Sequence, residues 1–380
     1  MVSCTASTLK GKVMGETGTK DPVVLLGGGH AHVEVVRQLA RRNLGREIIL
    51  VSPSRHAPYS GMLPGYIAGR YQFEDFHIDL AALCRRGGVS FVEGAAVGID
   101  AKRRQVLLCD GRVLTYRLLS LDIGSTPSLP QGVSGGVSVK PIASFTERLA
   151  RLDALAAGRQ GPLHLAVVGQ GVAGVEVAFA LKQRLLGKRV QIAIVGRAGR
   201  PVPARSYRAQ RMVEDELQQA GIAHYPGFDV VAFDNGTLIA RDGRRIDTDE
   251  AVWTTSSGAP DWLRETALDL DGAGFIRVDE TLRALSHPDI FAAGDVASLP
   301  DPRPKAGVFA VRQGPVLAQN ICRSLSREPL LPFRPQRAWL ALISLSDGRT
   351  IADKWGVAFS GRWVSEWKHR NDTQFVRRYS

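Results

Sequence analysis

The chain has 380 residues, of which 44% are hydrophobic and 23% are charged, and its formal net charge is +12. This length predicts two or three domains, and the composition is typical of a soluble globular protein. No uninterrupted apolar run approaches the roughly 18 residues that cross a bilayer, which excludes a transmembrane helix. The basic residues are scattered along the chain rather than collected in blocks. No nucleic-acid partner is therefore expected, while a weak attraction to acidic lipid surfaces stays open.

The first 20 residues contain no apolar segment of the kind that makes a secretory signal. Residues 1–20 are therefore interpreted as a flexible extension, with a transit peptide as the alternative. No closely spaced pair occurs among the four cysteines, which are Cys4, Cys84, Cys109 and Cys322. Neither a zinc knuckle nor a close redox dithiol is expected, and a reducing, cytoplasmic setting is favoured.

Residues 21–52 predict a strand, a glycine turn, a helix and a second strand. Val23–Leu26 is a continuous apolar run, as a buried parallel strand should be, and it leads into the turn Gly27-Gly28-Gly29-His30-Ala31-His32. One helical face from His30 to Arg42 is apolar, and Ile48–Val51 forms the next strand. In such a unit the helix N-terminus and the bare backbone amides receive a pyrophosphate.

This first turn departs from the full dinucleotide-binding motif at two positions. His32 stands where the third glycine is expected, and Ser52 stands where an acidic residue would accept hydrogen bonds from a ribose. The pair His30 and His32 does not predict a metal site, because no cluster of further ligands is visible in the sequence.

A second and complete motif begins at Gly169, after another apolar run. Gly169 makes the tight turn, Gly171 admits the pyrophosphate, and Gly174 lets helix and strand pack closely. A helix over Val172–Leu186 and a strand over Val190–Val195 complete the unit. Two such units indicate two dinucleotides held face to face, and so electron transfer between them. Binding two polyphosphate cofactors would also account for the excess of basic residues.

Further strands are expected over Ser90–Val92, in a hairpin around Asp110-Gly111, and over residues 272–297. We predict an α/β fold with two Rossmann-like dinucleotide-binding domains of the three-layer ββα type, the second inserted in the first, and a small C-terminal α+β segment. The predicted boundaries are 1–20 for the extension, 21–145 and 272–330 for the first domain, 146–271 for the second, and 331–380 for the C-terminal segment.

Asp295 ends the last of these strands, behind Gly294, where a ligand can approach closely. Its carboxylate could accept hydrogen bonds from a sugar-alcohol chain, or it could merely cap the next turn. A helix is predicted over Val308–Leu325, with a kink or restart at Pro315. The electropositive N-terminus of this helix would stabilise negative charge on a bound ring.

Four groups of residues carry a resemblance to a known family: the first glycine turn; Tyr59-Ser60-Gly61-Met62-Leu63-Pro64-Gly65; residues 304–314 from Pro304-Lys305-Ala306-Gly307 onward; and the ending from Trp367-Lys368 to Tyr379. Over about residues 21–330 the chain resembles the pyridine nucleotide–disulfide oxidoreductases, flavoproteins with two dinucleotide-binding domains. It looks most like the branch of type II NADH dehydrogenases and sulfide:quinone reductases. The flavoprotein module found fused ahead of selenide, water dikinase looks closer still.

The resemblance implies FAD in the first domain and NADPH or NADH in the second. No catalytic residue is assigned, because the cofactors carry the chemistry, although Glu176 is placed near the nicotinamide. The residues implied toward FAD are Gly27, Gly29, His30 and Ala31 at the pyrophosphate, Ser52 and Arg55 at the adenosine half, Val97 at the adenine, Gly124 in the crossover Asp122–Pro127, Asp295 at the ribityl chain, and Lys305, Ala306 and Gly307 at the ring. Those implied toward the nicotinamide cofactor are Gly169, Gly171, Gly174 and Glu176, with Ser257 and Gly258 in the second crossover.

The chain departs from the family pattern in the second domain. The second crossover, Thr254–Gly258, is looser than the family form. Gly196 ends the strand after the complete motif, and Arg197 and Arg200 follow, where an NAD enzyme should carry a carboxylate. The missing carboxylate and the two arginines favour a 2′-phosphate, and so NADPH over NADH; a solvated arginine loop is the alternative.

The predicted function is an FAD-dependent NAD(P)H oxidoreductase. No cysteine pair stands in the expected place, so electrons are expected to leave the flavin directly for a quinone or another small acceptor. Sulfide or selenium redox chemistry is one alternative, and a non-enzymatic flavin redox sensor is another.

Four aromatic residues near the C-terminus, Trp355, Phe359, Trp363 and Trp367, alternate with basic residues. They could form an interfacial face that contacts the inner side of a membrane. Packing in the core or in a homodimer is favoured instead, because nearby glycines predict strands and a short helix.

Overall fold

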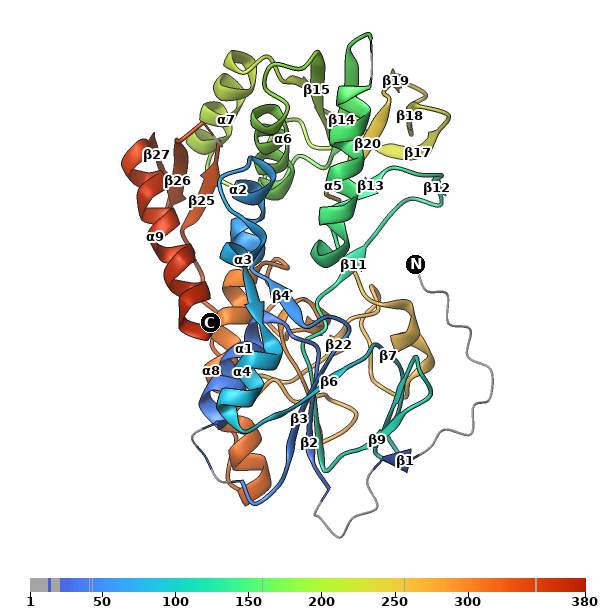
Figure 1. The fold of residues 1–380 in the computed structure, drawn as a ribbon, viewed down its shortest axis with the longest axis vertical. Helices are drawn as coiled ribbons and strands as arrows, with labels where there is room; N and C mark the ends of the chain where they lie inside the picture. The colour runs from blue at the N-terminus through green and yellow to red at the C-terminus, as the bar shows by residue number, and fades with distance from the viewer. Residues whose placement is uncertain are drawn as a thin grey trace.

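The computed structural model describes residues 13–14, 21–40, 42, 44–158, 160–255, 257–345 and 347–380. The predicted extension therefore lies outside the described residues, except for the short strand β1 (Val13–Met14). Cys4 and Ser256 also lie outside them. Figure 1 shows two lobes, each built on a central sheet, with the C-terminal helix along one flank of both.

The lower lobe of Figure 1 is built on a parallel sheet with strand order β23-β10-β2-β3-β6. Residues of β2, β3 and β10 are buried throughout, as continuous apolar strands covered on both faces should be. The bounds are β2 Val23–Leu26, β3 Ile48–Ser52, β6 Ser90–Glu93, β10 Leu118–Leu121 and β23 Ile290–Ala292.

Different layers cover the two faces of this sheet. Val23 and Leu25 belong to the core cluster shared with the helices, whereas Val24 and Leu26 belong to the cluster shared with a small antiparallel sheet. This alternation gives the predicted ββα layers. The helices are α1 (His30–Leu39), α4 (Leu80–Gly87) and α8 (Gly307–Ser326), and the antiparallel strands are β7 (Ala96–Asp100), β8 (Gln105–Leu108) and β9 (Val113–Thr115).

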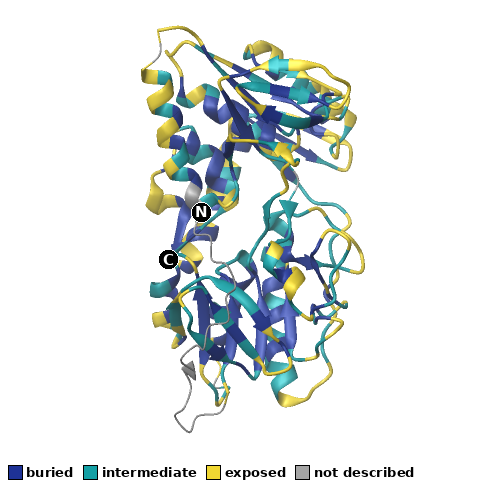
Figure 2. Ribbon diagram, turned by 90° about the vertical axis from the view of Figure 1, so that its right-hand side faces the viewer, coloured by how far each residue is buried: buried dark blue, intermediate teal, exposed yellow. Residues whose placement is uncertain are grey.

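The upper lobe repeats this plan with strand order β13-β20-β14-β15-β16. Figure 2 shows the buried strands at the centre of both lobes and exposed residues on the outer helices and loops. The parallel strands are β13 Val137–Ser138, β14 Leu163–Val168, β15 Val190–Val195, β16 Ala223–Tyr225 and β20 Glu250–Trp253; the helices are α5 Ile142–Ala157, α6 Val172–Arg184 and α7 Tyr207–Gln219; the antiparallel strands are β12 Gly132–Val133, β17 Val230–Asp234, β18 Thr237–Ala240 and β19 Arg245–Asp247.

The chain leaves the lower lobe and later returns to it. The outgoing strand β11 (Thr126–Pro127) pairs antiparallel with the returning strand β21 (Ser257–Gly258), and β23 then completes the first sheet beside β10. The second unit is therefore inserted in the first, and the predicted fold class is confirmed. The numerical domain boundaries stay predictions. Short elements fill the connections: β4 His56–Pro58, α2 Leu63–Ile67, α3 Phe73–Phe76, β5 His77–Asp79, β22 Ile276–Arg277 and β24 Ala297–Ser298.

The C-terminal segment is an antiparallel sheet of β25 (Ala341–Ser344), β26 (Thr350–Lys354) and β27 (Val357–Gly361), followed by α9 (Arg362–Tyr379). At 18 residues α9 is longer than the short helix that the glycines suggested. The helix α8 runs through Pro315 without a break, so the predicted restart is wrong, and the predicted kink stays a prediction. Within the described residues, no helix combines the length and the apolar character that crossing a bilayer requires.

Candidate functional site

The first glycine turn is shaped by the end of the neighbouring strand. Gly27 has φ of +97°, and an added Cβ there would lie 2.3 Å from the carbonyl oxygen of Asp122. A Cβ on Gly29 would lie 2.2 Å from the carboxyl carbon of the same residue. Only glycine fits at both positions, because Asp122 already fills the space.

The carboxylate of Asp122 binds the N-terminus of α1. Its Oδ2 accepts hydrogen bonds from the amides of Ala31, at 2.8 Å, and His32, at 3.0 Å. Burial raises the pKa of Asp122 to about 7, against the two amide hydrogen bonds, which lower it. The sequence shows Asp122 only as part of a crossover, so this role was missed. An Asp at the end of a strand gives no local signal that it caps a helix 90 residues away.

His32 replaces the third glycine with a buried side chain. Its Nδ1 lies 2.7 Å from the carbonyl oxygen of Gly27, and its Nε2 lies 2.8 Å from the hydroxyl of Ser120. A carbonyl only accepts, so Nδ1 donates and Nε2 accepts from Ser120. Burial lowers the pKa of His32 to about 4, so the ring is neutral. His32 is thus a structural residue that ties the turn to β10.

The second glycine turn is open. A Cβ on Gly174 would lie 1.8 Å from the carbonyl oxygen of Gly169, so helix and strand pack too closely for any side chain. A Cβ on Gly171 would meet nothing within 4 Å, and no side chain caps α6 at this residue. The hydroxyl of Thr254, in the place equivalent to Asp122, donates to the carbonyls of Val168 and Gly169 at 3.1 Å each. This helix N-terminus fits a phosphate.

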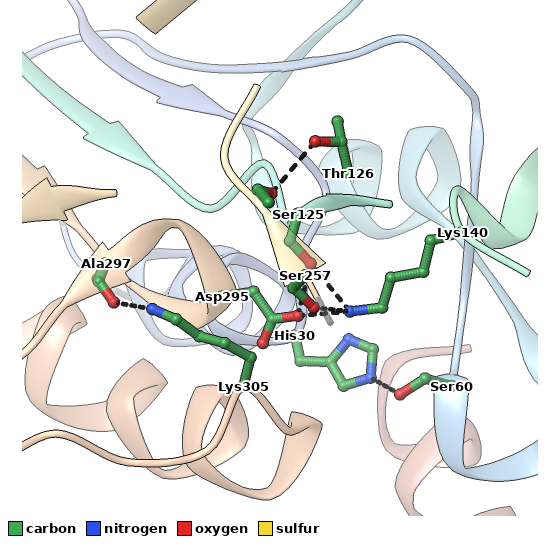
Figure 3. A network of polar contacts seen from close by, with 10 residues as sticks. His30, Ser60, Ser125, Thr126, Lys140, Ser257, Asp295, Ala297 and Lys305 are labelled. Atoms are coloured by element: carbon green, nitrogen blue, oxygen red, sulfur yellow. Dashed lines mark hydrogen bonds and ion pairs between the residues drawn. The ribbon is translucent and has the colours of Figure 1, made fainter. Parts of the chain in front are cut away.

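Asp295 lies where the two lobes meet, as Figure 3 shows. Its Oδ2 accepts from the hydroxyl of Ser125 at 2.9 Å and from the ammonium of Lys140 at 2.8 Å. Lys140 also donates to Ser257 of the second crossover at 3.0 Å. Burial by itself raises the pKa of Asp295, but Lys140 and Ser125 outweigh it and lower the pKa below its usual value. The sequence prediction missed Lys140, which belongs to no motif.

The N-terminus of α8 faces the first turn. A Cβ on Gly307 would lie 3.2 Å from the ring of His30, and the Nε2 of His30 lies 3.4 Å from the hydroxyl of Ser60. Lys305 donates to the carbonyl of Ala297 at 2.6 Å, and burial lowers the pKa of its ammonium. A cavity of about 190 Å³ adjoins this loop; it is lined by residues that include Asp295, Lys305, Ala306, Phe309 and Gln313.

The remaining residues predicted toward FAD come from separate elements of the lower lobe. Ser52 is buried at the end of β3, Val97 lies in β7, and Gly124 follows β10 with φ of +72°. The guanidinium of Arg55 pairs with Asp79 at 2.6 Å, so it already has an anionic partner. Asp79 in turn caps α4 through its contact with the amide of Ala82.

The loop that follows β15 carries the two predicted arginines. Gln170 fixes this loop, because its amide donates to the carbonyls of Ala198, at 2.7 Å, and Arg200, at 3.0 Å. A Cβ on Gly196 would lie 2.5 Å from the Gln170 side chain, which explains a glycine at the end of the strand. Arg197 is exposed, whereas the guanidinium of Arg200 lies 3.4 Å from Glu214.

Glu176 lies under the C-terminal segment. Its Oε1 accepts from the amide of Ser344 at 2.9 Å, and burial raises its pKa to about 7 against the charge of Lys368, which lowers it. The ammonium of Lys368 donates to Asp372 and to the carbonyl of Gly61, both at 2.6 Å. A cavity of about 340 Å³ adjoins this cluster; its lining includes Gly61, Tyr71, Ser344, Lys368 and His369. Lys368 was quoted for the resemblance, but its link to Glu176 was not predicted.

None of Cys84, Cys109 and Cys322 is in a disulfide. Cys84 is buried, and burial raises the pKa of its thiol to about 12, so it is inert at neutral pH. Within the described residues, no group of three or more His, Cys, Asp or Glu side chains could hold a metal ion.

Two dinucleotide-binding folds, the second inserted in the first, meet at Asp295 and Lys140. This arrangement defines a two-domain dinucleotide-dependent oxidoreductase. The chain belongs to the pyridine nucleotide-disulphide oxidoreductase family, whose model matches residues 21–314. Members of this family bind FAD and NAD(P)H, and this chain is an oxidoreductase of that class.

Relatives agree with this assignment. The chain is 26% identical over 364 residues to demethylphylloquinone reductase NdbB from Synechocystis, a match that covers 91% of this chain and 89% of that protein. Sulfide:quinone oxidoreductase from Aquifex aeolicus superposes with a TM-score of 0.79 at 18% identity, over 95% of this chain and 91% of that one. An engineered water-forming NADPH oxidase bound to NADPH gives a TM-score of 0.70 at 19% identity, over 87% and 74% of the two chains.

Proposed function

We propose that this protein oxidises NAD(P)H through FAD and passes the electrons directly to a quinone or a similar small acceptor. The observation that carries the proposal is the junction of Figure 3, where Asp295 of the first site and Ser257 of the second crossover share Lys140. This junction brings the cofactor-facing ends of both sheets together. The named function of the Synechocystis relative, reduction of a demethylphylloquinone, supports a quinone as acceptor.

The residues present fit both cofactors. At the first site, the N-terminus of α1 follows a turn of three glycines, and Asp295 offers a carboxylate to the ribityl hydroxyls of FAD. At the second, the open space at Gly171 and the uncapped start of α6 fit the pyrophosphate of NAD(P)H. When bound, the two cofactors supply hydride transfer and electron transfer, so this half of the reaction needs no protein acid or base.

The cluster of Glu176, Lys368 and Asp372 is proposed to serve the acceptor. Reduction of a quinone to a quinol takes up two electrons and two protons. With NAD(P)H as the donor, one of the two hydrogens arrives with the hydride, so one net proton must come from the protein or from solvent in each turnover. Glu176, with its pKa near 7, can give up and regain a proton at neutral pH. The cavity beside Lys368 has room for a small ring. The Glu176→Gln variant should keep flavin reduction by NADPH and slow the reoxidation of the flavin by quinone.

NADPH is the proposed electron donor. The loop after β15 itself lacks a carboxylate and presents Arg197 to solvent. A 2′-phosphate would find there a cation without an ion-pair partner among the described residues, while Glu214 pairs with Arg200. The engineered NADPH oxidase carries one change of aspartate to alanine and two changes to arginine relative to its parent. The loop of this chain likewise contains arginines and no carboxylate.

Peripheral contact with an anionic membrane is also part of the proposal. Trp355 is 78% exposed and Trp363 is 61% exposed, so these side chains do not pack in the core of one chain, while packing in a homodimer stays a prediction. We call the exposed residues Trp355, Val357, Phe359, Trp363 and Trp367 the aromatic patch. The basic side chains Arg362, Arg370, Arg377 and Arg378 are exposed along α9. Tryptophan beside arginine is typical of helices that lie in an anionic interface.

Vesicle binding tests this contact. The protein should sediment with vesicles that contain phosphatidylglycerol and remain in the supernatant with pure phosphatidylcholine. Trp363→Ser should weaken the binding, whereas Trp339→Phe, whose ring packs on Phe309, should not. If the vesicles do not bind and Trp363→Ser instead converts a dimer to a monomer in sedimentation equilibrium, the face is a homodimer interface.

The two alternatives gain no support from the described residues. Sulfide or selenium chemistry at a thiol would need a reactive cysteine at the junction, and Cys84 is buried in the apolar core. The link to the module fused to selenide, water dikinase rests on the motifs quoted above and stays a prediction. A protein that acted only as a redox sensor would bind its cofactors without catalytic turnover of NAD(P)H and a quinone.

Anaerobic reduction tests the proposed function. The flavin of the purified protein should lose its visible absorption when NADPH is added, more readily than with NADH, and regain it when a short-chain quinone is added. A flavin that neither nucleotide reduces would overturn the proposal. If NADPH reduces the flavin but quinones do not reoxidise it, the proposed NADPH dehydrogenase activity stands and a quinone is rejected as its electron acceptor.

A further inference from the structure

Lys140 joins four separate segments of the chain at one point. It lies between β13 and α5, and its ammonium contacts Ser125 in the first crossover, Ser257 in the second crossover and Asp295 after β23, at 2.9, 3.0 and 2.8 Å. An ammonium has three N–H donors, and each has an acceptor from a different segment. Figure 3 shows the Lys140 side chain entering from the side opposite Lys305.

The contacts hold Asp295 in one orientation. Both Ser125 and Lys140 bind its Oδ2, which leaves Oδ1 for another donor in the described part of the site. Lys140 also supplies the positive charge that keeps this mostly buried carboxylate ionised. Other charged groups contribute less at Asp295, although Lys305 acts in the same direction. Without Lys140, burial would favour the protonated acid, which has lost part of its capacity to accept hydrogen bonds.

We propose that Lys140 is a positioning residue for FAD and for the approach of NAD(P)H. It keeps Asp295 ionised and turned so that Oδ1 receives the ribityl hydroxyls. Through its contact with Ser257 it also ties the second crossover to the same point, and so helps to place the second lobe for the approach of NAD(P)H. This inference rests on the proposed binding of FAD at Asp295.

The two halves of this role predict different effects. Removing the charge should affect FAD binding through Asp295, and it should do so more strongly in acid. Removing the Ser257 hydroxyl leaves the contacts of Lys140 with Asp295 and Ser125. It should therefore leave FAD affinity unchanged and slow only the reduction of bound FAD by NADPH.

FAD affinity as a function of pH is the test, measured on apoprotein by the quenching of flavin fluorescence. Lys140→Met should weaken FAD binding about tenfold or more at pH 7, as the loss of hydrogen bonds to a charged group does. The deficit should be larger at about pH 5 than at pH 7, because loss of the Lys140 charge raises the pKa of Asp295 in the variant. Asp122 also faces Asp295 but is the same in both proteins, so the difference between them reports on Lys140. Lys140→Arg should restore most of the affinity and the wild-type pH profile, because it keeps the charge. Lys188→Met is the matched control, since Lys188 is exposed and far from the junction in sequence.

Four results separate the possibilities. Wild-type FAD affinity in Lys140→Met at both pH values would overturn the inference, as would a Lys140→Arg variant as defective as Lys140→Met. Should Lys140→Met fail to fold by circular dichroism, Lys140→Gln carries the same expectation. Failure of the wild type itself to bind FAD would overturn the proposed function instead. A rate of flavin reduction in Ser257→Ala equal to that of the wild type would reject the role of Lys140 in placing the second lobe.

Discussion

The two glycine turns of this molecule pack the start of a helix against the adjacent strands in different ways. In the second turn, Gly174 has no side chain, and the neighbouring strand contributes only the hydroxyl of Thr254. In the first, His32 fills the equivalent position and hydrogen-bonds across to β10, which contributes the carboxylate of Asp122 to the start of α1. The packing of the complete motif is determined mainly by its own glycines. The packing of the degenerate motif depends on the side chains of Ser120 and Asp122, about 90 residues away. A missing glycine therefore does not mean a missing nucleotide site.

The largest effect is expected at Gly174. The Gly174→Ala variant would place a Cβ 1.8 Å from the carbonyl of Gly169, which α6 can relieve only by moving off the sheet. We expect a loss of stability of about 4 kcal/mol or more and loss of NADPH binding. Chemical denaturation measures the first and NADPH fluorescence the second. A stable variant that binds NADPH would show that helix and strand do not need this contact.

His32→Gly makes the first turn look like the second, yet it should destabilise the protein. The change leaves a cavity, removes the partner of Ser120 and leaves the carbonyl of Gly27 without its donor. We expect a cost of about 3 kcal/mol. Ser120→Ala removes only the hydrogen bond between Ser120 and His32 and should cost about 1 kcal/mol. Equal or greater stability of His32→Gly in denaturant would contradict the structural role of the ring.

Asp122 should make stability depend on pH. Its folded pKa of about 7 lies above the ordinary value of 3.8, so the folded state binds the proton more tightly than the unfolded state. Stability should then fall as pH rises from about 4 to about 7, by about 2 kcal/mol after allowance for relaxation of the buried group. Asp122→Asn should reduce this slope in melts recorded across the range, and the part that remains belongs to Glu176, whose pKa is also raised to about 7. A slope that is unchanged in the variant would assign it to other groups.

The smallest effect is expected at the exposed end of the second site. The double variant Arg197→Ala with Arg200→Ala should raise the KM for NADPH about tenfold, as loss of a charged phosphate contact does, and leave the KM for NADH almost unchanged. The control is Arg211→Ala, which shares Glu214 with Arg200 but lies in α7. An equal loss with both nucleotides would place the arginines away from the 2′-phosphate.

The fold could be predicted because its signals are local. Buried parallel strands such as β2 and β14 are unbroken apolar runs, and the glycines of the second turn stand at fixed spacings around a strand and a helix. The continuation of α8 through Pro315 was not predicted. Proline removes one hydrogen bond, and packing against α1 can sustain a helix despite that loss.

The site was predictable only where its residues belong to motifs. Asp295 and the glycines stand in recognisable patterns, but Asp122, Lys140 and Gln170 act through tertiary contacts that span from 28 to 155 residues in sequence. No spacing rule connects such positions. For the aromatic patch, sequence could not decide between core and surface, because tryptophan is common in both, and the exposure of Trp355 decided it.

One variant tests most directly the claim that FAD binds at the first turn and NAD(P)H at the second. Gly171→Val adds a side chain where the structure has only open space, so it should fold normally and block the pyrophosphate at α6 alone. The purified variant should retain its full content of FAD while NADPH no longer bleaches it, although dithionite still does. Loss of FAD from this variant, with reduction by NADPH intact in whatever flavin remains, would contradict the assignment of the two sites.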